Sequence, residues 1–303
     1  MYVVIVNPIA GNGKSKKIFD KIKYSRYLAR NTRFFISEYE GHIEEIVRHM
    51  EETLDISLLF IVGGDGTVNE VVDALKDKSV PIAYIPGGSG NDFARGFPSL
   101  KDPDEIIRKA IEDKKQAEYW LATYSLGKER LHTFINCLGF GFDAEVTRAA
   151  RELSFRDLLS KYKLDSLIYL FALLRELFAF KPLKMTVEFD GVRRTFHNVL
   201  FLTVNNQPYM GGGMKINPSA QNNAKDLSII VVDSVPKWKV FLVFGTVFLG
   251  MHTFFKDVQI FKAKEITVQA DQPLPYQVDG EYGKTTYASI QKVKKPIYLK
   301  GTK

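Results

Sequence analysis

The sequence contains almost no cysteine and few histidines, and both shortages exclude classes of protein. Its single cysteine, Cys137, cannot form an intramolecular disulfide and is typical of a reducing compartment. The five histidines are scattered along the chain, and no two of them have the spacing of zinc ligands. The sequence therefore excludes a disulfide-stabilised domain and argues against a zinc enzyme.

The chain also lacks a hydrophobic run of the kind that forms a membrane span or a signal peptide. Residues 240–255 carry no charge but are too few, since a spanning helix needs about 20 apolar residues. Residues 164–180 are apolar but are interrupted by three charged residues. The N-terminal run Tyr2–Val6 is short, has no basic residue before it and predicts a buried strand. We expect a cytoplasmic protein whose two apolar segments face a core or lie at a membrane interface.

Acidic residues are fewer than basic ones, 35 against 42, and the net charge is +7. The basic excess is concentrated between Gly11 and Arg33, where Asp20 is the one acidic residue, and in the lysines of residues 292–303. Such segments suit phosphate groups of a nucleotide, a nucleic acid or an anionic membrane. A solvated helix face has the same composition, so charge alone leaves these alternatives open.

The first third of the chain predicts an α/β domain of the doubly wound type. With 303 residues the chain is too long for one small core, and two domains are expected. Predicted strands at Tyr2–Val6, Arg33–Ser37, Ser57–Val62 and Ile82–Ile85 alternate with predicted helices near Lys16–Leu28, Ile43–Met50, Val68–Lys76 and Asp104–Glu112. This alternation is typical of a parallel sheet covered by helices. Ligands bind beyond the carboxyl ends of such strands, where the glycine-rich turns occur.

After about Trp120 the sequence changes to short, spaced β runs, which predict a mainly antiparallel β-sandwich. The runs are Tyr119–Leu126, Leu131–Leu138, Lys184–Phe189, His197–Asn205, Leu227–Val232, Gln259–Phe261, Glu265–Gln269 and Tyr276–Val278. We place the nucleotide-binding domain at residues 1–122 and the sandwich at residues 123–291. Whether residues 292–303 return to the first domain, through a strand at 295–299, stays open.

The strongest motif is Gly63-Gly64-Asp65-Gly66-Thr67, which joins a predicted strand to a predicted helix. Glycines let a backbone approach a polyphosphate, and a helix N-terminus supplies N–H groups to it. Bare phosphate would repel Asp65, so we expect this carboxylate to act through Mg²⁺, water or an acceptor hydroxyl. An ordinary turn is the alternative, but it does not need three glycines.

Two further glycine-rich loops follow predicted strands. Residues 86–95 read Pro-Gly-Gly-Ser-Gly-Asn-Asp-Phe-Ala-Arg, in which Ser89 and Asn91 can bind phosphate or ribose and Asp92 can position a metal. Residues 7–15 end in Gly-Lys-Ser like a P-loop, but Pro8 stands where that motif requires its first glycine. We therefore expect a phosphate-binding loop of another kind, with Lys14 supplying the charge.

For two motifs of the second domain the sequence does not indicate a single role. Asp279-Gly280-Glu281 is typical of a hairpin turn, or else presents a carboxylate to the glycine loops of the first domain. The triple glycine at residues 211–213, preceded by Asn205-Asn206, forms a loop whose role the spacing does not reveal.

Together these motifs resemble the bacterial soluble diacylglycerol/lipid kinase family, which shares its catalytic domain with sphingosine and ceramide kinases. The segments that carry the resemblance are Asn7-Pro8 with Gly11, residues 63–70, residues 86–95, Gly139-Phe140-Gly141-Phe142-Asp143 and residues 279–281, in this order. NAD kinases also contain Gly-Gly-Asp-Gly-Thr, and phosphofructokinases nearly do. The Asn-Asp-Phe-Ala-Arg and late Asp-Gly-Glu segments favour lipid kinases. The resemblance covers nearly the whole chain.

The resemblance implies an ATP-dependent kinase that transfers the γ-phosphoryl group to a lipid hydroxyl in a cleft between the domains. Positions that bind ATP in the family correspond to Asn7, Pro8, Ile9, Ala10, Gly11, Ser37, Gly64, Asp65, Gly66, Thr67, Val68, Asn69, Glu70 and Ser89. Serine at 37 and 89 replaces the usual threonine and keeps the hydroxyl. Glu281 matches the family's proposed general base, and we expect Asp65 and Asp92 to position Mg²⁺, water or the hydroxyl.

One departure from the family concerns a second, structural Mg²⁺. The family usually holds it through an Asp-Gly pair, which is replaced here by Ala224-Lys225. Gln221 and Asp226 are the nearest remaining candidate ligands. We therefore expect weak or absent metal binding at this position.

The resemblance and the charge distribution predict the partners. We expect a lipid substrate at a membrane surface, transient peripheral association of a cytoplasmic protein, no nucleic acid and no stable protein partner, while a homodimer stays open. Two alternatives remain: a kinase of a soluble acceptor, as in NAD kinases, and a non-catalytic sensor of nucleotide or lipid.

Overall fold

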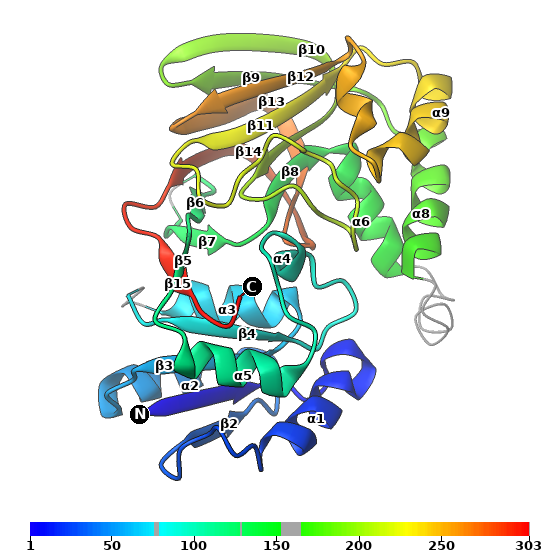
Figure 1. Cartoon of the computed structure of the whole chain (residues 1–303). Helices are drawn as coiled ribbons and strands as arrows, with labels where there is room; N and C mark the ends of the chain where they lie inside the picture. Colours follow the sequence, from blue (N-terminus) through cyan, green and yellow to red (C-terminus); the bar gives the residue numbers. More distant parts are fainter. Residues whose placement is uncertain (76–78, 128, 153–164, 303) are drawn as a thin grey trace. The chain divides into compact units, whose positions relative to one another are not determined.

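The computed structural model describes residues 1–303 except 76–78, 128, 153–164 and 303, and it divides into two compact units (Figure 1). The first unit contains Met1–Leu121 together with Lys294–Lys303, and the second contains Ala122–Val293. The division falls next to the boundary expected at residue 122. The C-terminal segment thus belongs to the first unit.

A six-stranded sheet forms the centre of the first unit, in the order β2-β1-β3-β4-β15-β5. The strands β1 (Tyr2–Val6), β2 (Arg33–Ile36), β3 (Leu58–Gly63) and β4 (Ile82–Pro86) run parallel to one another. β15 (Ile297–Leu299) is parallel to β4, and β5 (Ala117–Tyr119) is antiparallel to β15. The predicted parallel α/β architecture is confirmed, and the end of the chain completes its sheet.

Helices cover both faces of this sheet because alternate side chains of its central strands are buried on each side (Figure 1). On one face, α1 (Ala10–Ile22) and α5 (Pro103–Glu112) pack with Val4, Val6 and Phe60. On the other face, α2 (His42–Thr53) and α3 (Asp65–Ala74) contact each other. The predicted helix to Leu28 is wrong, since α1 ends at Ile22 and turns follow.

Nine antiparallel strands form the sheet of the second unit within the part of the chain that the structure describes. They are β6 (Ala122–Ser125), β7 (His132–Phe134), β8 (Cys137–Gly141), β9 (Leu183–Phe189), β10 (Val192–Asn205), β11 (Leu227–Asp233), β12 (Val258–Ala263), β13 (Glu265–Val278) and β14 (Glu281–Lys292). β8 pairs with β10 and β13, and β9 pairs with the same two strands. The sheet therefore curls back on itself around a buried core that includes Phe140, Val187 and Leu202.

Two predicted strand assignments in this region are wrong, and one strand was missed. The run Tyr119–Leu126 divides into β5 and β6, which belong to different sheets. The run Leu131–Leu138 contains parts of two strands, because β7 ends at Phe134 and β8 begins at Cys137. β14 was not predicted, because only Ala288 and Ile290 of its residues are buried and the hydrophobic signal is weak.

The helices of the second unit share a hydrophobic cluster with its sheet. They are α6 (Phe142–Glu152), α8 (Asp165–Ala179) and α9 (Lys237–Val247), and a 3₁₀ turn η1 (Met251–Phe254) follows α9. Their apolar side chains pack with Leu200 and Val232 of the strands. None of the described helices combines the length and apolarity that crossing a bilayer requires.

Candidate functional site

Three glycine-rich loops meet at the carboxyl ends of β1, β3 and β4. A Cβ atom placed on Gly11 would lie 2.1 Å from the carbonyl oxygen of Gly87. A Cβ atom on Gly88 would lie 2.5 Å from the Cα atom of Gly64. No side chain fits at these contacts, so the glycines let the three loops pack backbone against backbone. The loops form one continuous surface at this edge of the sheet.

The loop after β1 turns through three successive left-handed residues. Gly11, Asn12 and Gly13 have φ angles of 61°, 54° and 81°, a conformation that glycine and asparagine adopt most readily. The Asn7 side-chain amide donates to the Thr67 hydroxyl at 3.2 Å, which ties this loop to the one after β3. Lys14 follows the turn with its side chain exposed, so its charge is available to an anion above the loops.

The loop after β3 leads directly into α3, and Asp65 is the first residue of this helix. The Asp65 carboxylate accepts the backbone N–H of Asp92 at 3.0 Å and that of Phe93 at 2.8 Å. It therefore caps the short helix α4 (Asp92–Arg95), whose first N–H groups have no partner within the helix. This contact gives Asp65 a positioning role that its motif did not indicate.

The loop after β4 is held together by Asn91, whose backbone is left-handed with a φ of 53°. The Asn91 side-chain oxygen accepts from the Tyr84 hydroxyl at 3.0 Å and from the Gly88 N–H at 2.9 Å. Its amide donates to the Gly88 carbonyl at 2.7 Å. The Asn91 side chain therefore holds the loop together, and its binding of phosphate or ribose stays a prediction. Burial raises the pKa of Tyr84, helped by the charges of Asp65 and Asp92, so its hydroxyl stays protonated.

The remaining predicted residues of the first unit differ in exposure. Asp92 is buried and pairs with Arg95 at 2.7 Å, whereas Ser89 is exposed. Ser37 is buried after β2, and its N–H donates to the Val6 carbonyl at 2.8 Å. Val68 is a core residue whose N–H donates to the Gly64 carbonyl at 3.2 Å, and its contact with ATP stays a prediction.

Four side chains in or beside these loops differ in how far they are exposed to solvent. Ile9 is 80% exposed, and Glu70 is exposed on α3. Ser15 and Asn69 each have a buried oxygen without a hydrogen-bond partner among the described residues. A Cβ atom on Gly87 would lie 2.0 Å from the Ser15 hydroxyl, so this hydroxyl lies directly beneath the loop after β4.

Asp279-Gly280 forms a two-residue hairpin turn between β13 and β14 in the second unit. Its φ angles of 47° and 96° are those that a type I′ turn requires. The Asp279 carboxylate accepts the N–H groups of Ile135, Asn136 and Cys137 at 2.7, 2.9 and 3.0 Å. The hairpin interpretation is therefore confirmed, and Asp279 anchors the chain before β8.

Glu281 begins β14 directly after this turn, and its side chain is 76% exposed. Both of its carboxylate oxygens accept from the guanidinium of Arg151 in α6, with 2.9 Å between Nη1 and Oε2. A two-bond pair of this kind fixes the plane of a carboxylate as well as its position. The turn and Arg151 together hold Glu281 in one orientation at the surface of the second unit.

Asp143 is a polar residue of the second unit that was not predicted as a site residue. It lies in the first turn of α6, and its Oδ1 atom is enclosed without a hydrogen-bond partner among the described residues. Its Oδ2 atom accepts from the Gln277 amide at 3.3 Å. Burial raises the pKa of Asp143 to about 7, against the smaller opposing effects of hydrogen bonds from Gln277 and Ala144.

Asp143 is linked to the turn that carries Glu281. The Gln277 side chain donates to Asp143 and accepts the Gly280 N–H at 3.0 Å. A Cβ atom on Gly139 would lie 1.8 Å from Oδ2 of Asp143, so this glycine makes room for the carboxylate. The Gly139–Asp143 segment was a signal in the sequence that could have identified the residue.

The residues predicted to hold a second Mg²⁺ do not fit a metal site. Gln221 and Asp226 are exposed, and Ala224 offers no side-chain oxygen. The Gln221 carbonyl already accepts the Ala224 N–H at 3.1 Å. Over the described residues, no three histidine, cysteine or acidic side chains are grouped as metal ligands. Weak or absent metal binding by Gln221 and Asp226 therefore stays a prediction.

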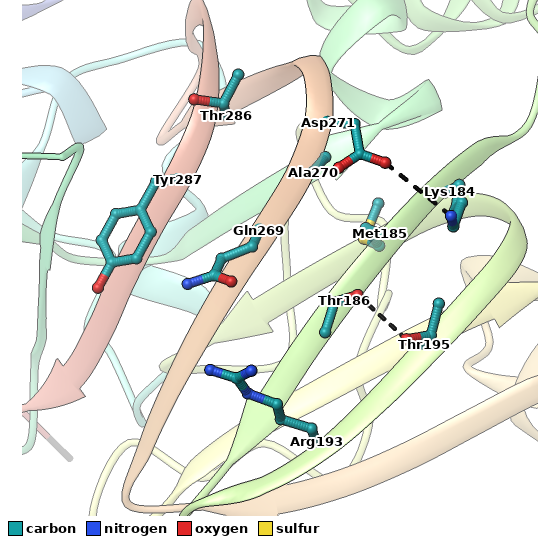
Figure 2. A pocket seen from close by; sticks show the side chains of 10 residues that line it. All are labelled: Lys184, Met185, Thr186, Arg193, Thr195, Gln269, Ala270, Asp271, Thr286 and Tyr287. Carbon is teal, nitrogen blue, oxygen red and sulfur yellow. Dashed lines mark hydrogen bonds and ion pairs between the residues drawn. The ribbon is translucent and has the colours of Figure 1, made fainter.

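An open groove of about 450 Å³ lies along strands of the second unit (Figure 2). Its lining residues are Lys184, Met185, Thr186, Arg193, Thr195, Gln269, Ala270, Asp271, Thr286 and Tyr287. Lys184 pairs with Asp271 at 4.0 Å, and the hydroxyls of Thr186 and Thr195 are 3.1 Å apart. The groove contains none of the predicted site residues, so we do not assign the activity to it.

Comparisons with known proteins agree with this arrangement. The diacylglycerol kinase catalytic domain matches residues 1–119, and the YegS C-terminal NAD kinase beta sandwich-like domain matches residues 136–296. The Bacillus subtilis protein named "Putative lipid kinase YtlR" is 33% identical over 98% of both chains. A protein named diacylglycerol kinase from Mycobacterium tuberculosis is 28% identical over 78% of this chain and 74% of its own length. A solved diacylglycerol kinase structure from Bacillus anthracis has a TM-score of 0.71 at 19% identity, covering 98% of this chain and 95% of that one, which shows a common fold.

Proposed function

Since the chain belongs to the kinase family formed by the diacylglycerol kinase catalytic domain and the YegS C-terminal domain, we propose that it transfers the γ-phosphoryl group of ATP to a lipid hydroxyl. The observation that carries the proposal is the backbone packing of three glycine-rich loops at one sheet edge. The names of the relatives, a lipid kinase and a diacylglycerol kinase, support a lipid as the acceptor.

In this proposal the first unit binds the nucleotide phosphates. The loop backbones approach the phosphates without interference from side chains, and the N-terminus of α3 contributes N–H groups and its dipole. Lys14 adds a positive charge. Mg²⁺ bound together with ATP would supply positive charge that offsets the charge of the phosphates. Asp65, whose carboxylate accepts the N–H groups of Asp92 and Phe93 and so caps α4, would also position the metal or a water.

Glu281 of the second unit serves as the general base for the acceptor. It takes the hydroxyl proton while the acceptor oxygen bonds to the γ-phosphorus and the bond to the leaving ADP oxygen breaks. Arg151 orients the carboxylate, and Asp143 with Gln277 supports the turn on which Glu281 lies. Phosphoryl transfer depends mainly on such positioning and on charge stabilisation.

Labelling of a total lipid extract with [γ-³²P]ATP tests the proposal, with NAD⁺ offered in a parallel reaction. We expect a labelled lipid that requires Mg²⁺ and that disappears with the Glu281→Gln variant, which controls for contaminating kinases. Phosphorylation of NAD⁺ without labelled lipid would establish the soluble-acceptor alternative. ATP binding without any labelled product would indicate a sensor.

A further inference from the structure

Large apolar side chains are exposed in one short segment of the second unit, on α9 and η1. Figure 1 shows where α9 lies in this unit. We call this the α9–η1 face and define it by Trp238, Phe241, Phe248, Leu249, Met251 and Phe254. Trp238 is 67% exposed, Leu249 71% and Phe254 85%. Scattered exposed apolar residues are ordinary on protein surfaces, but a contiguous group of this size marks an interaction site.

The α9 helix is apolar on two sides, and the fold of the second unit uses one of them. Val240 and Phe244 pack on the cluster shared with α6 and α8, and Val247 packs beside Met210 and Ile216. Trp238, Phe241 and Phe248 follow one another at helical spacing on the exposed side. Core packing therefore explains the inward side only, and the outward side needs a partner outside the unit.

The charges around the α9–η1 face select an anionic partner. Residues 235–256 include Lys237, Lys239 and Lys256 and no acidic residue. Lys239 pairs with Asp257 just beyond this segment, whereas Lys237 donates to the Phe178 carbonyl, a neutral group, at 2.6 Å. Phe178, itself 76% exposed at the end of α8, lies next to the start of α9 and extends the apolar surface.

We propose that the α9–η1 face is a membrane-docking surface, which inserts its aromatic and aliphatic side chains into the headgroup region of an anionic bilayer. A tryptophan and phenylalanines flanked by lysines, without acidic residues, suit this interface, because the rings enter the acyl boundary while the ammonium groups reach the lipid phosphates. The idea that docking brings lipid to the active site rests on the proposed function. The docking of this face on a membrane does not depend on that function.

The basic segment Gly11–Arg33 of the first unit is a weaker candidate for the same role. Lys21 pairs with Asp102 at 2.8 Å, and Lys23 pairs with Asp20 at 2.8 Å, so part of its positive charge is compensated. Exposed charge alone gives binding that salt screens. The α9–η1 face combines charge with apolar side chains and therefore should bind vesicles even when salt is added.

Vesicle co-sedimentation of the full chain without ATP tests the proposal, with vesicles of phosphatidylcholine alone or mixed with phosphatidylglycerol. We expect binding to the mixed vesicles and a loss of about tenfold or more in Phe241→Ser/Leu249→Ser, because each apolar side chain contributes when it leaves water. Leu131→Ser/Val192→Ser is the matched control, since these side chains are 57% and 61% exposed in the same unit outside the face. The control should bind like the parent, and thermal unfolding should show that both variants are folded.

Trp238 fluorescence gives a second, site-specific measurement in a Trp120→Phe background, which leaves a single tryptophan. We expect its emission to shift to the blue on the mixed vesicles and to be quenched by lipids brominated in their acyl chains. Unchanged emission, or equal vesicle binding by both variants, would overturn the proposal. Self-association in sedimentation velocity that Phe241→Ser/Leu249→Ser abolishes, without vesicle binding by the parent, would instead make the face a contact between copies.

The docking proposal and the proposed function can fail separately. If the parent phosphorylates a lipid in detergent micelles but does not bind vesicles, the function stands and the docking surface is wrong. If it binds vesicles through Trp238 but labels no lipid, the docking surface stands and the function is wrong.

Discussion

At the scale of single residues, the structure distinguishes carboxylates that hold the protein together from one that is exposed at the surface. Asp65 and Asp279 both accept backbone N–H groups from segments distant in sequence, so they position loops. Glu281 has its side chain 76% exposed and is held by Arg151. Removing the negative charge should therefore have different effects at Glu281 and at Asp65.

Glu281→Gln should reduce kcat by about 10²- to 10⁴-fold, because the amide cannot accept the hydroxyl proton. ATP affinity, measured by isothermal titration calorimetry, should change little, since the proposed phosphate site lies in the first unit. Near-normal turnover in this variant would leave Glu281 with no role beyond its pair with Arg151.

Asp65→Asn should weaken ATP binding and lower the melting temperature together. The amide oxygen can accept one of the N–H groups of Asp92 and Phe93, but its NH₂ group faces the other, so α4 loses part of its cap. The expected cost is about 1–2 kcal/mol of stability. A variant of normal stability whose activity needs more Mg²⁺ would show that Asp65 acts on the metal alone.

Asp143→Asn should make stability less dependent on pH. The pKa of Asp143 is raised to about 7, so the folded parent holds a proton more tightly than the unfolded chain and loses stability as pH rises from about 4 to 7. The variant has no ionisable group at this position, so it does not lose stability in this way. Its free energy of unfolding relative to the parent should therefore increase by about 2–3 kcal/mol between pH 5 and pH 8.

Urea unfolding at the two pH values measures this difference. Asp271→Asn is a suitable control, since the Asp271 side chain is 91% exposed in the same unit. A pH-independent difference for Asp143→Asn would show that the Asp143 carboxylate is ionised in the folded protein across this range.

At the scale of elements, the glycine loops act as packed pieces of backbone. Gly88→Ala should push the loop after β4 away from Gly64, because the added Cβ would lie 2.5 Å from a backbone atom that no side-chain rotation can move. We expect a loss of about 1–3 kcal/mol in stability and a marked loss of ATP binding.

Gly66→Ala is the matched control, since a Cβ there would have nothing within 4 Å. It should leave stability unchanged, as measured by thermal unfolding. Equal effects of the two substitutions would contradict backbone packing as the reason for glycine at position 88.

At the scale of the whole molecule, the C-terminal segment completes a sheet formed otherwise by the first third of the chain. β15 lies between β4 and β5, and Ile297 and Leu299 are buried in this unit. Ile297→Ala should therefore cost about 2–5 kcal/mol of unfolding free energy. Tyr298→Phe, at a half-buried neighbouring position, should cost much less. Denaturant unfolding monitored by circular dichroism measures both, and a mild effect of Ile297→Ala would mean that β15 contributes little to the sheet.

The sequence by itself determined the two fold types, the doubly wound first unit and the antiparallel second unit, because both follow from local hydrophobic periodicity and turn residues. It also determined the family, since the glycine motifs are short and contiguous. It could not determine that β14 is a strand, because few of its side chains are buried and its pairing with β13 creates most of its stability.

Only the tertiary structure decided what the polar residues of the motifs do. The partners of Asp65 lie 27 and 28 residues away, and those of Asp279 lie 142–144 residues away. The sequence does not distinguish a carboxylate that caps a distant helix from one that faces a substrate. The two apolar sides of α9 are likewise indistinguishable in the sequence, and only packing shows which side the fold buries and which it leaves exposed.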